Sequence, residues 1–417
     1  MGHIYHALGL HLHQPLGNLV SLLNSSEIWE AKQILWCYDR ITRMLEGYED
    51  IARLHISCSG TLLKQLEDPA IRQMFRDVAD IAEFMERFKR SPIEFAGSGL
   101  YHPVYPLIPE ADWDAQTQWW QGIGSHMLGR PSFNGFWPPE MGFCMEMIPM
   151  LKRHGYRYVL VDCWYIKPKR EMRWEEMRYR PYIARYGGEE IVVIPRDREL
   201  SDAQESGLDP GWFQHELYER TKWCDFPALA TTWTDGENGG WFRSPDIESS
   251  FWGGFYHEIL NRYRAGTLGF IPTHITEYLD KYPPGEEVEV HRGAWNTGDH
   301  WGGDFAQWTG SLLQRKGFDE IRSASAYYHK TKKMFDLHSE AAGSAEEIRQ
   351  LIVDAYDAIL TAETSCNFFW GSTWVHKSFD NLEQAYRLLD VANEKLNSKQ
   401  ARETAMDRAQ NLEFGTQ

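Results

Sequence analysis

Short β-rich runs alternate with amphipathic helical stretches up to about residue 275 of this 417-residue chain. Such alternation joins each strand to the next through a helix, which sets neighbouring strands parallel. The pattern therefore predicts an α/β fold with a parallel sheet or barrel rather than a β-sandwich. The expected strands are Ile4–Leu10, Ala52–Ser57, Ile93–Ala96, Phe133–Trp137, Tyr158–Val161, Ile191–Pro195, Ala228–Thr232 and Leu268–Ile271.

Helical periodicity fills the intervals between these strands, as at Trp29–Tyr48 and Ala70–Lys89. The segment Pro283-Pro284-Gly285 is typical of a break between domains, and beyond it the chain becomes rich in Ala, Leu, Glu and Lys. We predict a barrel domain over residues 1–285 and a C-terminal helical domain over residues 286–417. The helices expected in the second domain are Phe318–Asp336, Ala345–Leu360 and Asn381–Leu396.

The charge balance limits the partners of this chain. It carries 60 acidic and 43 basic residues, a formal net charge of −17. Phosphate groups require a basic footprint, so we exclude nucleic acid and an anionic membrane as partners. The six cysteines are scattered without a CxxC pair, and the N-terminus lacks the features of a signal peptide, so we expect a cytoplasmic protein. The oligomeric state stays open, a homo-oligomer included.

Polar side chains follow nearly every predicted strand. These strand ends carry His11 and His13, Ser59, Glu94 followed by His102, Glu140, Asp162, Arg196 and Asp197, Asp235 and Glu237, and Thr273 and His274. The loops that follow parallel strands meet at one end of a barrel, where such folds build their sites. Packing does not account for polar residues at the same end of so many strands, so we expect the functional site there.

The segment Gly135-Phe136-Trp137-Pro138-Pro139-Glu140-Met141-Gly142-Phe143 is the most informative motif. Two prolines stiffen the exit of the strand and deliver Glu140 between aromatic residues. A carboxylate held in this way can attack the anomeric carbon of a sugar. The alternative is that Glu140 only caps the helix that follows it.

A second acidic motif reads Ala230-Thr231-Thr232-Trp233-Thr234-Asp235-Gly236-Glu237. Its β-branched run ends at Asp235, and Gly236 allows an immediate turn. Glycoside hydrolysis needs a nucleophile and a proton donor with a raised pKa, so Glu140 and Asp235 form a candidate pair. An ordinary Asp-Gly turn is the alternative, and Glu237 competes with Asp235 for the role of the acid.

The ordered segments HLHQP, EFAGSGLYHPVYP, WPPEMGF, TTWTDGENGGW and AETSCNFFWG resemble the five sequence regions of glycoside hydrolase family 57. The resemblance spans residues 4 to about 375, and the order of the motifs makes it specific. It implies an incomplete (β/α)7 barrel, with the C-terminal helical domain completing the active-site cleft. It also implies retaining chemistry on the α-glucosidic bonds of α-glucans or maltooligosaccharides, without a cofactor.

Carried over by motif, the resemblance makes Glu140 the nucleophile and Asp235 the acid/base, with their carboxyl groups roughly 5–5.5 Å apart. His13 would lie at the donor-sugar subsite, with Glu94, His102 and Trp137 nearby. The other residues expected to bind substrate are Asp162, Arg196, Glu237, Trp241, Trp295 and Trp370.

The fifth region departs from the family pattern, because Cys366-Asn367 precedes the aromatic residues where family members usually carry an aspartate. Loss of this carboxylate would remove an acceptor for sugar hydroxyls, which puts a preference for ordinary α-1,4-glucan in doubt. Whether water or a sugar hydroxyl accepts the glucosyl group stays open, since that choice depends on the shape of the acceptor subsites.

Two other functions compete with this interpretation. His11 and His13 share one face of a strand and would bind a metal if a third ligand joined them, as in a carbohydrate deacetylase on a related barrel. No His-Asp pair stands beside them, so we expect no metal. A glucan-binding protein that has lost turnover is the other alternative.

The aromatic residues make up 14% of the chain. Indole rings present a broad surface to the CH faces of sugars, but about half or more of these rings are expected to fill the interior. We predict that Trp241, just after the acidic motif, forms a wall of a sugar subsite. The other rings expected near the mouth of the barrel belong to Trp119-Trp120, Phe242, Phe251-Trp252 and Trp301.

Overall fold

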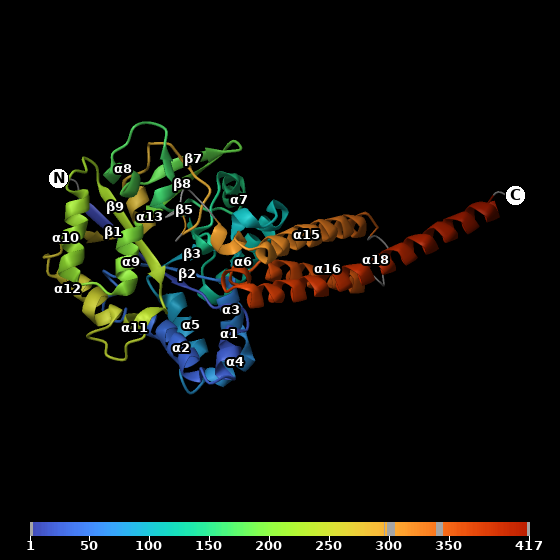
Figure 1. Ribbon diagram of the computed structural model, residues 1–417, viewed down its shortest axis with the longest axis horizontal. Coiled ribbons are helices and arrows are strands. Elements are labelled where there is room, and N and C mark those ends of the chain that lie inside the picture. The colour runs from blue at the N-terminus through green and yellow to red at the C-terminus, as the bar shows by residue number, and fades with distance from the viewer. Residues whose placement is uncertain (1–2, 296, 298–304, 339–344, 415–417) are drawn as a thin grey trace. The chain divides into compact units, whose positions relative to one another are not determined.

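The computed structural model describes residues 3–295, 297, 305–338 and 345–414 (Figure 1). The chain divides into two compact units. The first unit contains Met1–Pro106 and Asp114–Asp304, and the second contains Leu107–Trp113 and Phe305–Gln417. No helix among the described residues is both long enough and apolar enough to cross a membrane.

The first unit is an incomplete (β/α)7 barrel. In the described part of the chain, parallel ladders join seven strands in the order β9-β1-β2-β3-β4-β5-β8. In the described residues, no ladder joins the two outer strands of this series, β9 and β8. Instead, the backbone N–H of Asp197, just after β8, donates to the carbonyl of Thr231 on β9 at 2.9 Å. The strands are β1 (Ile4–Leu12), β2 (Leu54–Cys58), β3 (Glu94–Gly97), β4 (Gly135–Phe136), β5 (Tyr158–Asp162), β8 (Glu189–Arg196) and β9 (Ala228–Asp235).

Every predicted strand overlaps an observed one, the last of them being β10 (Ile271–Pro272), which pairs with the start of β1. Sequence patterning missed β6 (Ile166–Pro168), β7 (Tyr182–Tyr186) and β11 (Val288–Val290). These strands pair antiparallel, β7 with β8 and β11 with β6, outside the βα alternation. Because β11 pairs with β6, the chain just beyond the predicted boundary at residue 285 groups with the barrel.

Helices follow the barrel strands. The predicted helix Ala70–Lys89 is divided into two, because Asp80 has an extended backbone and its side chain caps the second helix by accepting from the Glu83 N–H. The α-helices of this region are α1 (Asn18–Leu23), α2 (Ile28–Arg43), α3 (Gly60–Glu67), α4 (Pro69–Phe75), α5 (Ile81–Arg90), α6 (Glu110–Leu128), α7 (Ile148–Arg153), α8 (Trp174–Arg178), α9 (Arg198–Ser206), α10 (Pro210–Thr221), α11 (Gly239–Phe242), α12 (Glu258–Arg264) and α13 (Ile275–Lys281). A π-helical turn, η5 (Phe251–His257), precedes α12.

Large rings fill the centre of the barrel. Trp137 and Trp233 are fully buried and stack with their ring centroids 5.0 Å apart. Gly9 on β1 leaves the space that this stack needs, since a Cβ there would lie 2.0 Å from the Trp233 ring. The tightly packed interior supports the loops at the carboxyl ends of the strands.

The second unit is helical. Its helices are α14 (Ala306–Thr309), α15 (Leu312–His338), α16 (Ala345–Ala362), α17 (Cys366–Phe369) and α18 (Ser372–Phe414), in agreement with the predicted helical C-terminal third (Figure 1). Asp112, at the start of α6, is fully buried in this unit. Its Oδ1 accepts hydrogen bonds of 2.9 Å from His329 on α15 and from the Tyr356 hydroxyl on α16.

Replacing Asp112 with alanine is expected to destabilise the helical unit by about 1–3 kcal/mol, because it removes a buried acceptor shared by two helices. The measurement is the Tm of thermal unfolding followed by circular dichroism. Asp319→Ala is the matched control: Asp319 is 71% exposed and pairs with Arg322 three residues on, so its removal should leave Tm nearly unchanged. Equal shifts in both variants would contradict a structural role for Asp112.

Candidate active site

Predicted site residues gather at the carboxyl ends of several strands. Asp162 ends β5, Arg196 ends β8 and Asp235 ends β9. The ladders pair His11 with Asp235 and Asp162 with Arg196, so these side chains lie at one level of the barrel. This is the end at which parallel barrels assemble active sites.

Glu140 lies in a short 3₁₀ turn after β4, η2 (Pro139–Met141), with a left-handed φ of 56°. A non-glycine residue in this conformation is strained and needs support from its surroundings. The Trp295 backbone N–H donates to the Glu140 carbonyl at 2.8 Å, and the Trp295 indole N–H donates to Glu140 Oε2 at 2.8 Å. The carboxylate therefore bonds to an indole in the mouth of the barrel, which argues against the alternative of a simple helix cap.

Asp235 is half-buried, and its Oδ2 accepts a hydrogen bond of 2.6 Å from the Asn238 amide. Burial raises the pKa of Asp235 well above its usual range, and the negative charges of Glu237, Glu205 and Glu140 raise it further. Glu140 is thus close enough for its charge to favour the protonated form of Asp235. A carboxylate beside a carboxyl group with a raised pKa is the kind of pair that glycoside hydrolysis requires.

Glu237 lies only two residues from Asp235 but is 2% exposed. Its Oε1 accepts hydrogen bonds of 3.0 Å from the His13 backbone N–H and from the Tyr38 hydroxyl on α2. Burial raises the pKa of Glu237 to about 7. The prediction that Glu237 binds substrate does not fit this placement: the turn at Gly236 directs its carboxyl group into the protein, where it supports His13.

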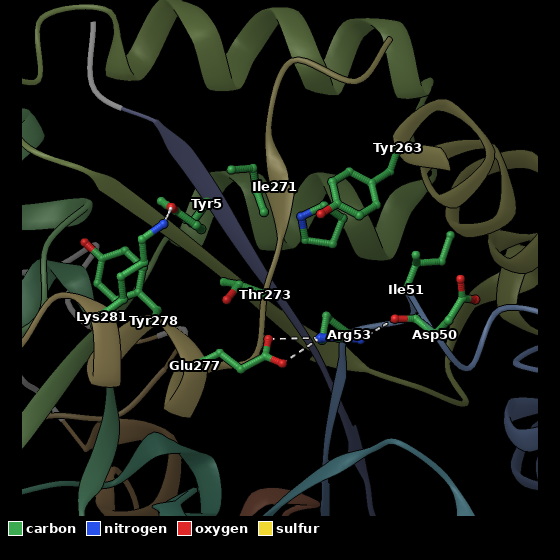
Figure 2. Close-up of a pocket in the computed structure, with 11 residues that line it drawn as sticks. Tyr5, Asp50, Ile51, Arg53, Tyr263, Ile271, Thr273, Glu277, Tyr278 and Lys281 are labelled. Carbon is green, nitrogen blue, oxygen red and sulfur yellow. Dashed lines mark hydrogen bonds and ion pairs between the residues drawn. The ribbon is translucent and has the colours of Figure 1, made fainter. Parts of the chain in front are cut away.

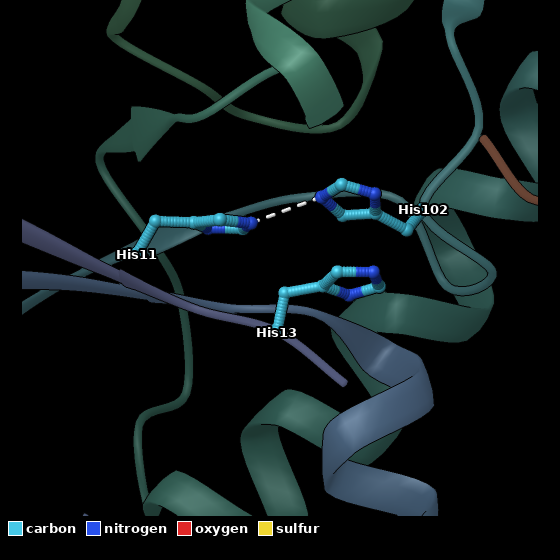
Figure 3. Close-up of side chains that lie close together, drawn as sticks. All are labelled: His11, His13 and His102. Atoms are coloured by element: carbon cyan, nitrogen blue, oxygen red, sulfur yellow. Dashed lines mark hydrogen bonds between the residues drawn. The ribbon is translucent and has the colours of Figure 1, made fainter. Parts of the chain in front are cut away.

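The side chains of three histidines, His11, His13 and His102, lie close together (Figure 3). His11 Nε2 and His102 Nε2 are 2.9 Å apart, and the ring of His13 lies parallel to that of His102 with centroids 3.8 Å apart. His102 Nδ1 lies 3.6 Å from Glu140 Oε1. Burial lowers the pKa of His13 to about 3 and those of His11 and His102 well below the usual value, so all three rings are neutral. Neutral imidazoles can both donate to and accept from sugar hydroxyls.

The ligand nitrogens of these histidines lie within 4.8 Å of one another, which is close enough to test them as a metal site. A zinc ion lies about 2.0–2.1 Å from each imidazole nitrogen, along the lone pair in the plane of the ring. The rings of His13 and His102 are parallel to within 13° and stacked, so one ion cannot lie in both planes. The arrangement does not fit a metal shared by the three rings, and the absence of a metal stays a prediction.

Arg196 and Asp162 are buried beside this stack. Arg196 Nε donates to the Trp233 carbonyl at 2.7 Å, and its guanidinium lies 5.7 Å from the centre of the Trp295 ring. Asp162 Oδ2 accepts from Arg198 Nε at 2.8 Å and lies 3.7 Å from Arg196 Nη1. Asp162 therefore anchors two arginines, one of which, Arg198, was not among the predicted residues.

The structure corrects the position of Glu94. It is the first residue of β3, not one that follows the strand, and it is paired in register with His55. Its carboxylate accepts from the Tyr158 hydroxyl at 2.6 Å and from the Thr276 hydroxyl at 2.5 Å. Glu94 lies near the start of the predicted strand Ile93–Ala96 and begins the observed one, so it faces groups from the opposite end of the barrel rather than the donor-sugar subsite.

The predicted tryptophans have different surroundings. Trp137 is fully buried and stacks on His11 with centroids 5.4 Å apart, so it supports the histidines instead of contacting substrate. Trp241 packs edge-on against Phe251 and donates to the Gln204 carbonyl at 3.1 Å. Trp370 belongs to the helical unit and is 58% exposed. Trp301 lies outside the described residues.

Several residues of the site escaped prediction. Tyr38 donates a hydrogen bond to Glu237, and Arg198 donates one to Asp162. The charge of Glu205 on α9 raises the pKa of Asp235. None of them belongs to a motif or follows a predicted strand directly.

A cavity of about 250 Å³ lies at the opposite end of the barrel (Figure 2). It is lined by residues at the start of β1, before β2 and on α13, among them Tyr5, Arg53 and Glu277. Arg53 Nε is 2.9 Å from both carboxylate oxygens of Glu277, and Lys281 donates to the Tyr5 hydroxyl at 2.9 Å. Arg53 and Glu277 thus pair with each other within this cavity, and the two candidate catalytic carboxyl groups are not part of its lining.

Two carboxyl groups at the mouth of a parallel barrel, one of them with a raised pKa, are the features that glycoside hydrolysis requires. Residues 7–291 match the family described as glycosyl hydrolase family 57, and the chain belongs to this family.

Curated relatives and solved structures are also similar to this chain. The chain is 28% identical over 291 residues to an alpha-amylase of Pyrococcus furiosus, covering 66% of this chain and 39% of the relative. It is 28% identical over 295 residues to a 4-alpha-glucanotransferase of Thermococcus litoralis, covering 68% and 40%. The chain thus spans about two fifths of the length of these curated relatives. The fold is similar to that of a GH57-type branching enzyme from Pyrococcus horikoshii, with a TM-score of 0.69, 16% identity and coverage of 95% and 94%.

Proposed function

We propose that this chain cleaves α-glucosidic bonds of α-glucans or maltooligosaccharides and retains the anomeric configuration. The observation that carries the proposal is the carboxylate of Glu140, held by the Trp295 indole and close enough to Asp235 for its charge to raise the pKa of that residue. The names of the relatives, alpha-amylase and 4-alpha-glucanotransferase, support an α-glucan as the substrate.

In the first step, a carboxylate oxygen of Glu140 attacks the anomeric carbon while Asp235 gives its proton to the departing glycosidic oxygen. A covalent glucosyl-enzyme forms, and the part of the glucan beyond the cleaved bond leaves as an alcohol. In the second step, Asp235, now ionised, removes a proton from the acceptor hydroxyl as that oxygen attacks the anomeric carbon. Glu140 is released as a carboxylate, and two inversions together give retention.

The neutral histidines are well suited to hold the sugar at this centre. A neutral imidazole accepts one hydroxyl hydrogen bond and donates another without attracting the carboxylates as a cation would. Glu237 fixes the backbone of His13, and Trp137 supports the ring of His11. We propose that His13, which is half-buried, positions the donor sugar over Glu140, with the buried His102 stacked against its ring.

The decisive experiment is product analysis with α-linked oligosaccharides and polysaccharides, combined with NMR detection of the anomer formed first. Reducing sugar alone indicates hydrolysis, longer chains indicate transfer, and new branch points indicate branching. Retained α-configuration supports the proposal. Inversion, or no cleavage of any α-glucan, would overturn it.

We propose that Asn367, at the place where the family usually carries an aspartate, changes the preference among α-linkages or chain lengths. Asn367 is buried in α17 of the helical unit. We also propose a cytoplasmic location, which is supported by six cysteines that are all buried and free.

Replacing Trp295 with phenylalanine removes the indole N–H that bonds to Glu140 Oε2. We expect kcat to fall about 10- to 100-fold, since hydrogen bonds to charged groups contribute about 1.5–3 kcal/mol. The acidic limb of the pH profile should move to higher pH, because the ionised carboxylate loses a donor. Steady-state kinetics across pH test this, with Trp212→Phe as the control, because Trp212 is exposed on α10 and its replacement should leave the acidic limb in place.

A further inference from the structure

Trp164 is an exposed aromatic residue at the catalytic end of the barrel. It lies in the 3₁₀ turn η4 (Cys163–Tyr165), immediately after β5, and 44% of it is exposed. Its backbone N–H donates to Asp162 Oδ1 at 3.0 Å, so the turn is tied to the end of the strand. The catalytic steps above give Trp164 no role, and its exposure shows that it is not a core residue.

A fixed cation supports the Trp164 ring. The Arg198 guanidinium lies 4.6 Å from the ring centre, and Arg198 itself is 5% exposed. Arg198 Nε donates to Asp162 at 2.8 Å and Nη2 donates to the Thr297 carbonyl at 2.9 Å. The indole therefore rests on a guanidinium held by two hydrogen bonds, which restrains the ring while part of its surface meets solvent.

Trp164 is connected to the nucleophile through a short series of contacts. Asp162 holds Arg198 beneath Trp164 and also lies 3.7 Å from Arg196 Nη1. The Arg196 guanidinium faces the Trp295 ring, and the Trp295 indole bonds to Glu140. Because β4 and β5 are neighbours in the sheet, the turn that carries Trp164 lies next to the turn that carries Glu140 on the rim of the barrel.

We propose that the Trp164 indole is a stacking platform for a glucosyl unit of the substrate that lies outside the units flanking the cleaved bond. Glucosyl rings present apolar CH faces that pack on a broad, restrained indole. A platform of this kind favours long chains, because only a long chain reaches it while its cleavable bond is at Glu140. This inference rests on the proposed function.

The test compares kcat/KM of wild type and Trp164→Ala across maltooligosaccharides from three to seven units and on amylose. We expect a loss of about 3- to 15-fold on the longest substrates and less than 2-fold on the shortest one. Trp164→Phe should keep most of the activity. Trp212→Ala is the matched control, because Trp212 is equally exposed at 44% but lies on α10; it should match wild type on every substrate.

A loss that is uniform across chain length, or no loss in Trp164→Ala, overturns the platform while the proposed function stands. A second measurement separates the two proposals: calorimetric binding of maltoheptaose to Glu140→Gln, with and without Trp164→Ala. If wild type cleaves no α-glucan but binding still weakens on loss of Trp164, the platform stands and the proposed reaction fails. If binding is the same in both variants, the platform is overturned.

Discussion

Replacing Glu140 with glutamine should lower kcat on α-glucans by at least about 1,000-fold. Glutamine has nearly the shape of glutamate and can still accept from the Trp295 indole, but its amide oxygen is too weak a nucleophile to form a stable glucosyl-enzyme. The fold should be preserved, because the left-handed backbone at residue 140 already carries a side chain of this size. Steady-state kinetics and circular dichroism of the purified variant measure the two effects.

Glu146→Gln is the matched control, since Glu146 is exposed and lies in the turn η3 (Met145–Met147) just beyond the motif. Its activity should stay within about twofold of wild type. In Glu140→Ala, added azide should restore turnover of an activated α-glucosyl donor and yield the β-glucosyl azide, because the small anion takes the place of the missing carboxylate. Residual activity above a tenth of wild type in Glu140→Gln would show that another group is the nucleophile.

Much of this architecture could be predicted from the sequence because local patterns control it. Hydrophobic periodicity predicts the alternation of strands and helices. The Trp-Pro-Pro-Glu segment at the exit of β4 indicates Glu140 as a candidate site residue without reference to distant residues. The antiparallel strands β6, β7 and β11 were missed because they are short, carry charged residues and lie outside the βα alternation. Their pairing depends on contacts across more than a hundred residues for β6 and β11.

The roles of some site residues were harder to predict. For some, the exact position of the residue in its strand decides which groups it meets, and for others a partner distant in sequence does so. Glu94 lies in a recognisable motif, yet β3 starts at this residue and directs it to Tyr158 and Thr276. Side chains alternate along a strand, so sequence alone does not settle which level of the barrel a residue reaches. Glu237 is buried by Tyr38, a residue 199 positions away in sequence, and no local pattern contains that contact.

Replacing Asp235 with asparagine tests which acidic residue donates the proton. We expect kcat to fall about 100- to 10,000-fold on maltooligosaccharides, whose leaving groups need protonation. An α-glucosyl fluoride should lose far less in the first step, because fluoride leaves with little help from an acid. Burst kinetics with the fluoride and steady-state kinetics with maltooligosaccharides measure this contrast.

The pH profile provides a second test. The acid must be protonated, and burial with the charges of Glu237, Glu205 and Glu140 raises the pKa of Asp235. Wild-type activity should therefore fall as the pH rises through the raised pKa of Asp235. Asparagine carries no proton to lose, so the alkaline limb should flatten in Asp235→Asn.

Glu237→Gln should behave differently, although the two residues are separated only by Gly236. Glutamine can still accept from the His13 N–H and the Tyr38 hydroxyl, so kcat below pH 7 should change by less than about 10-fold. Glu237 ionises as the pH passes about 7, and its charge then raises the pKa of Asp235. Without that charge, the alkaline limb should move to lower pH but keep its slope. A flattened limb and a 100-fold loss in Glu237→Gln would instead make Glu237 the acid, and the hydrogen bonds from Tyr38 and His13 would then hold the proton donor itself.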